Sequence, residues 1–230
     1  QKFIRRLPTD AVQYTWRCVY HRSMTQHSQI TTLRQNLADH AVPLDGADAA
    51  VLIAIFTGGD EPEVLLTRRP THMTSHAGEV AFPGGKRDRD DSSLTDTALR
   101  ESEEEVALPR ASVEIIGALK PARAKSGIKV LPVVGLVHDE PELMGNPSEV
   151  ESLFRVPLRF FFEQKPVRDH RINFRGIDLV VPCFRYQGYI IWGLTAYMLV
   201  EFMRQGFDHA IDYPWPPILP GVLVPQKKSD

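Results

Sequence analysis

The sequence is poor in cysteine and nearly balanced in charge, and each feature excludes a class of protein. Its 230 residues include two cysteines, Cys18 and Cys183, far apart and without a Cys-x-x-Cys or Cys/His spacing. A disulfide framework and a zinc site are therefore not expected, and a reducing, intracellular compartment fits best. The formal net charge of -2 gives no overall bias toward nucleic acid or acidic membranes. Any anion site must be local.

Long apolar runs are also missing. The most apolar stretch, Tyr189 to Val200, stops at Glu201 and falls well short of the roughly 20 residues that cross a bilayer. We expect it to be buried core. Arg5 and Arg6 open the chain, but no apolar signal segment follows them. The sequence thus favours a cytoplasmic protein with no membrane and no nucleic acid as partner, and leaves a homodimer open.

The length allows one main domain. We expect an N-terminal segment over residues 1–48, a main domain over 49–206 and a Pro-rich tail over 207–230. Ile30, Leu33 and Leu37 stand at helical spacing and predict one helix in the first segment, docked on the main domain.

Within the main domain, strand and helix patterns alternate irregularly. Strands are predicted over 49–56, 63–69, 113–119, 129–137 and near 177–192, and helices over 94–107 and 194–205. The hairpins among these strands differ from the regular βαβ repeats of a doubly wound fold. The pattern favours an α/β sandwich, with a mixed sheet flanked by helices.

The helix predicted over 94–107 carries an unusual acidic cluster. Glu101, Glu104 and Glu105 stand at i, i+3 and i+4, which places their Cβ atoms about 5–6 Å apart on one face. Left unpaired, such like charges cost roughly 0.2–0.5 kcal/mol per pair, whereas divalent cations would bind between them. The alternative is a solvated acidic face with an ion pair between Arg100 and Glu104.

The stretch GGKRDRDDSSLTDTALRESEEEVAL, residues 84–108, resembles the Nudix box, a glycine and a glutamate followed by R-E-x-x-E-E-x-G. The loop is one residue longer than the general pattern, Ser92 or Asp91 replaces the first glutamate, and Ala107 replaces the late glycine. The resemblance implies a Nudix-type α/β/α sandwich. It also implies a hydrolase that cleaves a diphosphate linkage with Mg²⁺ or Mn²⁺.

A longer resemblance narrows the substrate class. LLTRRPTHMTSHAGEVAFPGGKRD is similar to the segment before the box in Nudix enzymes that cleave coenzyme A, and IWGLTA, residues 191–196, to that group's C-terminal motif. It implies cleavage of coenzyme A or an acyl-CoA to adenosine 3′,5′-bisphosphate and a 4′-phosphopantetheine. However, the motif has Ser where this chain has Pro70, and a further Arg where it has Thr74-Ser75.

These departures leave two alternatives open. One is hydrolysis of another small nucleotide-type substrate, such as a dinucleotide, ADP-ribose or a nucleotide sugar. The other is a noncatalytic nucleotide-sensing module, which need not retain a repulsive acidic cluster.

The resemblance also assigns roles in the box. Glu101 and Glu105 are expected to be the principal metal ligands, and Glu104 a further ligand or the base that positions water. The Gly84 carbonyl is expected to add a ligand, and Arg100 to orient the glutamates by ion pairing.

Another carboxylate is expected from outside the box, and Glu149 or Glu151 is the candidate. The alternative for these acids is the first turn of a short helix that begins at Ser148. His72 and His76 are expected to be exposed loop residues outside the catalytic core.

Candidate phosphate-binding cations flank the box on both sides. They are Arg68, Arg69, Lys86, Arg87, Arg123 and Lys125. For each cation alone, a solvated surface position is the alternative. Phe82 and Trp192 are expected to pack rather than to bind a ligand.

Overall fold

The computed structural model describes residues 25–39, 46–73, 75–124, 126–174 and 177–211. The predictions for Cys18, Thr74, Lys125 and most of the Pro-rich tail fall outside these residues. Within them, no helix is long and apolar enough to cross a membrane.

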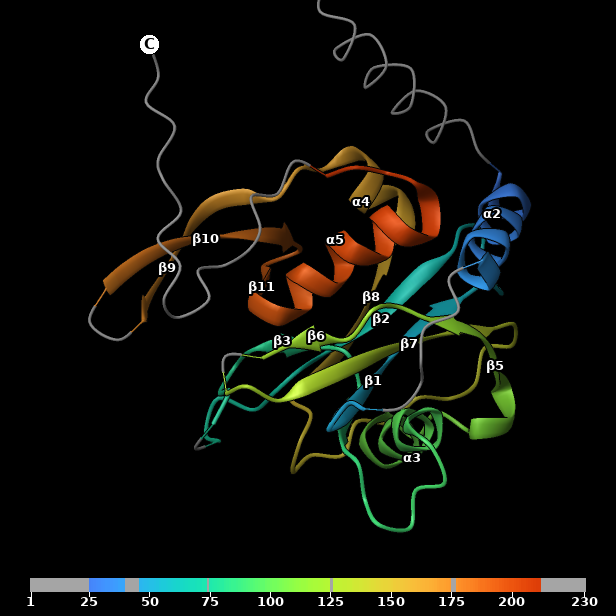
Figure 1. Ribbon diagram of the computed structural model, residues 1–230, viewed down its shortest axis with the longest axis horizontal. Helices are drawn as coiled ribbons and strands as arrows, with labels where there is room; N and C mark the ends of the chain where they lie inside the picture. Colours follow the sequence, from blue (N-terminus) through green and yellow to red (C-terminus); the bar gives the residue numbers. More distant parts are fainter. Residues whose placement is uncertain (1–24, 40–45, 74, 125, 175–176, 212–230) are drawn as a thin grey trace, which may run out of the picture.

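A mixed sheet forms the centre of the molecule (Figure 1). Strand β1 (Ala49–Phe56) runs parallel to β7 (Lys129–Val137) along its whole length. On its other side, β1 pairs antiparallel with β4 (Gly84–Lys86) at its start and with β2 (Glu63–Arg68) at its end. The remaining strands extend the sheet: β3 (Val80–Ala81) and β8 (Ser152–Pro157) pair with β2, and β5 (Val113–Ala118) and β6 (Ala122–Arg123) pair with β7.

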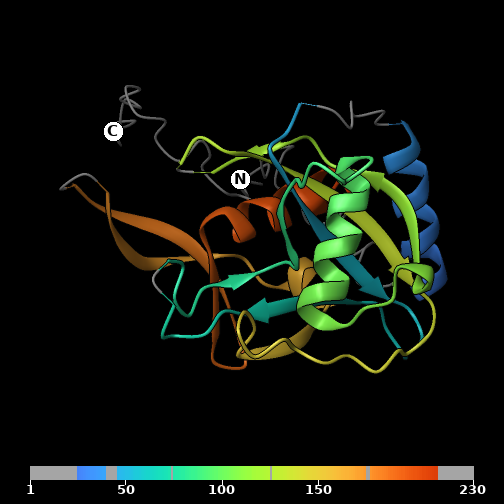
Figure 2. The same cartoon turned by 90° about the horizontal axis from the view of Figure 1, so that it is seen from below.

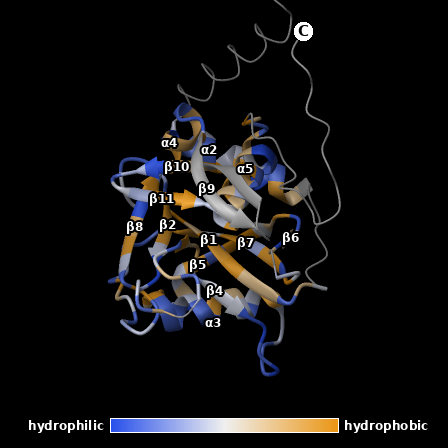
Figure 3. Ribbon diagram, turned by 90° about the vertical axis from the view of Figure 1, so that its left-hand side faces the viewer, coloured by the Kyte–Doolittle hydropathy of each residue, from blue (hydrophilic) through white to orange (hydrophobic). Residues whose placement is uncertain are grey.

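Helices cover both faces of this sheet. Alternating residues of β1 face opposite ways, so Leu52 and Ala54 pack toward α3 (Leu94–Val106), whereas Ile53 and Ile55 join the core under α2 and α5. Helix α3 lies in front of the sheet when the molecule is seen from below (Figure 2). Helices α2 (Gln26–Asp39) and α5 (Gly193–Phe207) lie on the other face. The hydropathy colours show the apolar strands β1 and β7 between these layers (Figure 3).

A second, three-stranded sheet was only partly predicted. It contains β9 (Val167–Phe174), β10 (Ile177–Tyr186) and β11 (Tyr189–Trp192), of which β9 was missed. A short helix, α4 (Leu158–Glu163), a 3-10 turn, η1 (Arg110–Ser112), and the strands β3, β4, β6 and β8 of the central sheet were also missed. The predicted helices and the other predicted strands are present, with bounds that differ by a few residues.

An exposed ion-pair cluster fastens α2 to the sheet. The Arg34 guanidinium donates to both oxygens of Glu114 on β5 at 2.5 and 2.6 Å, and His138 Nε2 lies 2.8 Å from Glu114 Oε2. Hydrogen bonds from Arg34 first, and then from His138, lower the pKa of Glu114 to about 2. Because 40% of the Arg34 side chain and 44% of the Glu114 side chain are exposed, water and salt screen this cluster.

We expect Glu114→Gln to lower the free energy of unfolding by about 0.5 kcal/mol at low salt, and the difference to vanish near 1 M NaCl. A depressed carboxyl pKa stabilises the fold above the unfolded pKa of about 4.3. The contribution should therefore fade as the pH falls from about 4.3 toward 2. Denaturant titrations test this, with the exposed Glu142→Gln as control; equal effects of the two variants would contradict it.

Candidate functional site

The glycine turn of β4 lies directly against α3. Gly84 has φ +152°, and a Cβ atom there would lie 2.4 Å from the Ala50 carbonyl oxygen. At Gly85 a Cβ atom would lie 2.4 Å from the Glu101 carboxyl carbon. Only glycines allow the strand to approach both β1 and the helix this closely.

Both ends of α3 are capped. Ser93 Oγ accepts the Asp96 N–H at 3.1 Å at the start of the helix. At the other end Ala107 takes the left-handed conformation, with φ +54°, and its N–H bonds the Glu103 carbonyl. Glycine adopts this conformation without a Cβ penalty, which explains why the box pattern has a glycine where this chain has Ala107.

Glu105 is the buried acid of the site. Its side chain accepts the Gly84 N–H at 3.2 Å, and the residue is only 5% exposed. Burial raises the pKa of Glu105 to about 7; the Gly84 bond and the Arg69 charge oppose this, whereas the charges of Glu149 and Glu101 add to it. A negative charge at Glu105 is therefore costly unless a cation compensates it.

Glu101 and Glu149 complete the acidic cluster. Burial raises the pKa of Glu101, Arg100 opposes the rise, and Glu104 and Glu149 add to it. Glu149 lies in a turn held to the helix end, because the Asn146 N–H bonds the Glu105 carbonyl at 2.8 Å. The alternative for these acids, a short helix that begins at Ser148, does not form; Asn146 Oδ1 instead accepts the Ser148 N–H and hydroxyl in a turn.

Arg100 connects these acids to the turn. Its Nη2 lies 3.0 Å from Glu101 and donates to the Lys86 carbonyl at 3.2 Å, and its Nη1 donates to Glu104 at 3.0 Å. Glu104 is thus paired with Arg100 and is 57% exposed. Glu104 was expected to be a metal ligand, with an ion pair to Arg100 as the alternative. The structure contains the ion pair.

Asp91 fixes the position of the Arg100 side chain by hydrogen bonds. It accepts from Arg100 Nε at 2.8 Å and Nη2 at 3.0 Å, from Thr97 Oγ1 at 2.8 Å and from the Asp88 N–H at 2.8 Å. These bonds, that of Arg100 first, hold the pKa of Asp91 well below its usual range despite burial. Either Asp91 or Ser92 was expected to replace the first glutamate of the box. The structure shows that Asp91 is the one that binds Arg100, from a loop one residue longer than the general pattern.

We expect Asp91→Asn to lower the free energy of unfolding by about 2 kcal/mol, because hydrogen bonds to a charged partner are lost around a 4%-exposed side chain. Kinetics should show a lower kcat as Arg100 and Glu101 lose their fixed positions. The control is Asp90→Asn, an exposed acid one residue away. Melting curves that do not separate these two variants would refute the prediction.

The predicted cations are not gathered in one place. The Arg69 side chain lies close enough to Glu105 to lower its pKa, and Arg69 Nε is buried with no hydrogen-bond partner among the described residues. Arg68 forms a 3.4 Å ion pair with Glu151, so Glu149, and not Glu151, faces the acidic cluster.

The other cations lie outside the cluster. Arg87 Nη2 holds the loop by donating to the carbonyls of Asp91 and Ser92 at 3.3 and 3.5 Å, and Lys86 is exposed. Arg123 donates to the Gly127 carbonyl at 2.8 Å on β6, with β7 and β1 between it and β4. Phe82 is buried in the core, as expected, and Trp192 is partly buried.

The donor set suits a hard divalent cation. Carboxylate and carbonyl oxygens are the ligands that Mg²⁺ and Mn²⁺ prefer. The mutual repulsion of Glu101, Glu149 and the buried Glu105 would be relieved by a cation. Within the described residues, no three His, Cys, Asp or Glu side chains are already arranged to hold a metal ion.

The sandwich fold places glutamates of one helix against a glycine turn, close to an arginine whose Nε is buried, an arrangement suited to a hard cation and an anionic ligand. The family model for the NUDIX domain matches residues 46–173. The chain belongs to the Nudix family and is a Nudix hydrolase with the Nudix fold. Nudix hydrolases generally use divalent metal cations and act on nucleoside diphosphate derivatives.

Relatives agree with this assignment. The chain is 46% identical over 157 residues to "Uncharacterized Nudix hydrolase NudL" of Yersinia pestis (strain Pestoides F), covering 68% of this chain and 78% of the relative. The same values hold for NudL of Yersinia pseudotuberculosis serotype O:1b (strain IP 31758). An Ap4A hydrolase from C. elegans superposes with a TM-score of 0.42 and 17% identity, covering 48% of this chain and 80% of that one.

Proposed function

We propose that this Nudix hydrolase cleaves the diphosphate linkage of coenzyme A or an acyl-CoA, giving adenosine 3′,5′-bisphosphate and a 4′-phosphopantetheine. The main support is Arg69, a cation with an unpartnered buried nitrogen beside the Glu105 carboxylate. Such a guanidinium is suited to a phosphate oxygen. Arg69 is also the second arginine of the LLTRRP segment, residues 65–70, which resembles the coenzyme A group.

In this proposal the carboxylates of Glu101, Glu105 and Glu149, with the Gly84 carbonyl, would hold Mg²⁺ or Mn²⁺. A bound ion would supply charge neutralisation on the diphosphate and an acidified water. Arg100 keeps the Glu101 carboxylate beside the turn, because it is itself fixed by Asp91 and the Lys86 carbonyl. Glu104 would join the ion or the water only by leaving Arg100.

Arg69 would bind one phosphate of the linkage and orient it against the acidic cluster. We expect Arg69→Lys to raise KM at least 10-fold while kcat falls less than 3-fold, since a lysine cannot form the paired hydrogen bonds of a guanidinium. Steady-state kinetics test this, and Arg159→Gln, an exposed ion-pair residue of α4, is the control. An unchanged KM for Arg69→Lys would remove Arg69 from the phosphate site.

Hydrolysis of another nucleoside diphosphate derivative is the second candidate. It is favoured by Pro70, which follows Arg69 where the coenzyme A motif has serine, and by Thr74-Ser75 in place of the motif's further arginine. Arg68 does not replace that arginine freely, because it is paired with Glu151.

In the deciding experiment, purified protein is incubated with Mg²⁺ or Mn²⁺ and with coenzyme A, NADH, ADP-ribose or a dinucleoside polyphosphate in turn, and hydrolysis of each compound is measured. Cleavage of coenzyme A alone supports the first proposal, and cleavage of only the others supports the second. Turnover of none would favour a nucleotide sensor. The cost of keeping Glu101, Glu105 and Glu149 together speaks against a sensor.

A further inference from the structure

The loop between β2 and β3, residues 70–79, carries polar groups to the acidic cluster's side of the sheet. The Arg69 N–H donates to the Glu79 carbonyl at 3.0 Å, continuing the register in which Arg68 faces Val80 and Thr67 faces Ala81. Residues directly opposite in an antiparallel pair place their side chains on the same face. Glu79 therefore shares a face with Arg69, whose charge acts on Glu105.

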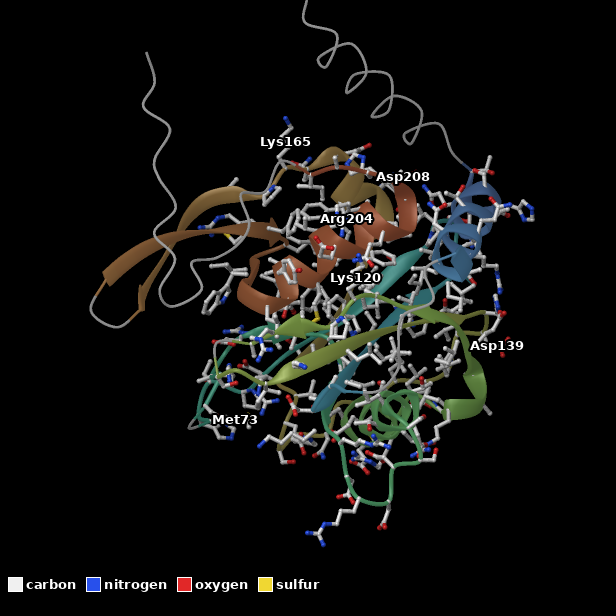
Figure 4. All side chains as sticks on the ribbon, viewed as in Figure 1. Met73, Lys120, Asp139, Lys165, Arg204 and Asp208 are labelled. Atoms are coloured by element: carbon white, nitrogen blue, oxygen red, sulfur yellow. The ribbon has the colours of Figure 1, made fainter. Side chains whose placement is uncertain are left out.

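That face is the one covered by α3. Side chains alternate along β2, and Leu65 belongs to the core beneath α3. Thr67 and Arg69 follow Leu65 at the same two-residue spacing, so Arg69 and Glu79 stand on the α3 side. Figure 4 shows Met73, the labelled residue of this loop, at the edge of the molecule, away from Asp139 on the opposite side. Arg69, where this loop begins, is thus close enough to the acidic cluster to act on Glu105, and His76 further along the loop is exposed to solvent.

Glu79 holds His76 in a fixed position. The two side chains meet at 2.8 Å between Glu79 Oε2 and His76 Nδ1, and the Glu79 N–H donates to the His76 carbonyl at 3.2 Å. His76 has φ +55°, a left-handed conformation that costs a non-glycine residue energy. An exposed ion pair alone contributes too little to explain this arrangement, because the His76 side chain is 70% exposed.

The contact between Glu79 and His76 leaves His76 Nε2 and Arg69 Nε without a hydrogen-bond partner among the described residues. Since the Glu79 carboxylate accepts from Nδ1, the free position of the imidazole is Nε2, which has no hydrogen-bond partner among the described residues. Glu79 pairs with His76 and not with Arg69, which stands opposite it, and Arg69 Nε likewise has no partner there. Arg69, whose charge acts on Glu105, and His76, held by the residue opposite Arg69, therefore each offer a donor with no partner among the described residues.

We propose that His76 is a substrate-binding residue, positioned by Glu79, whose Nε2–H donates to a phosphoryl oxygen of the nucleotide. This rests on the proposed function, hydrolysis of a nucleoside diphosphate derivative. In this arrangement Nδ1–H donates to Glu79 and Nε2–H donates to the phosphoryl oxygen. Arg69 and His76 then bind the substrate from the loop side, opposite the glutamates of α3.

Two substitutions separate the functions of the ring nitrogens. His76→Asn keeps a residue that tolerates the left-handed conformation and places an amide near the Nδ1 position, but nothing reaches Nε2. His76→Gln places an amide nitrogen near Nε2. We expect KM to rise about 10-fold or more in His76→Asn with kcat within 3-fold of wild type, and His76→Gln to recover part of the loss. His72→Asn, in the same loop and exposed, should match wild type.

Binding of ADP in the presence of Mg²⁺, measured by calorimetry, tests the inference without turnover, because coenzyme A, ADP-ribose and dinucleotides share this part. The affinity should fall about 10-fold in His76→Asn and recover partly in His76→Gln. Equal affinities of wild type and His76→Asn, or no binding of ADP to wild type, overturn the inference. Wild type that binds ADP but hydrolyses none of the substrates would overturn the proposed function and leave the His76 result standing.

Discussion

Glu105→Gln should lower kcat by about 10³-fold or more with little change in the fold. The substitution keeps the size of the side chain and an oxygen that can accept the Gly84 N–H, but removes the charge at the centre of the acidic cluster. Loss of a carboxylate that binds a catalytic ion or positions water typically costs 10²–10⁴-fold. Single-turnover kinetics with saturating Mg²⁺ measure it, and Glu103→Gln, which is half exposed on the same helix, is the control.

The same substitution should stabilise the metal-free protein at high pH. The folded-state pKa of Glu105, about 7, lies above the unfolded value of about 4.3, so the folded state holds this proton more tightly. Stability associated with the proton is complete below about pH 4.3 and is lost as the pH rises through about 7. At pH 8 the loss is on the order of 4 kcal/mol, at about 1.4 kcal/mol per pKa unit.

In EDTA, wild type should therefore lose melting temperature between pH 5 and pH 8 more steeply than Glu105→Gln, and Mg²⁺ should restore part of the wild-type loss. The residue is 5% exposed, so solvent screening removes little of this effect. If the melting temperatures of the two proteins change with pH in the same way, ionisation of Glu105 does not destabilise the fold and this prediction is wrong. A kcat within 10-fold of wild type would separately remove Glu105 from the chemistry.

Much of the central fold follows from local sequence pattern. The apolar residues of β1 are bounded by glycines, and α3 is bounded by Ser93 at its start and Pro109 after its end, so these elements could be located from the chain alone. Strand β9 could not, because residues 168–171, Arg-Asp-His-Arg, lack apolar alternation. Its backbone hydrogen bonds are instead satisfied by antiparallel pairing with β10, the strand that follows it, which the polar residues of β9 do not indicate.

The site shows the same division. Helical spacing places Glu101, Glu104 and Glu105 on one face of α3, but it does not reveal which carboxylate Arg100 holds. Asp91 and Ser92 could not be distinguished either, because the difference is which side chain the loop turns inward.

Alanine substitutions at Gly84 and Gly85 should have different effects, the first on stability and the second on activity. Gly84→Ala places a methyl group 2.4 Å from the Ala50 carbonyl oxygen and 2.5 Å from the Val51 Cα atom, and neither backbone group can yield. The positive φ adds strain. We expect a loss of about 3 kcal/mol or more in unfolding free energy, measured by denaturant titration.

Gly85→Ala is different, because its φ is not positive and the three atoms nearest to its new methyl group all belong to the Glu101 carboxylate, at 2.4–2.6 Å. That carboxylate is the end of a flexible side chain and can swing away, so stability should change by less than about 1 kcal/mol. Activity should nevertheless fall about 100-fold, since the displaced group leaves Arg100 and the acidic cluster.

A double-mutant cycle identifies the cause. Glu101→Asp shortens the acid and should itself lower kcat, but in the Gly85→Ala background the shorter side chain avoids the methyl group. The two losses should therefore combine to less than their product, whereas independent effects would multiply. A full product of the two losses, with both single variants folded, would mean that Gly85 acts on the site by a route other than the position of the Glu101 carboxylate.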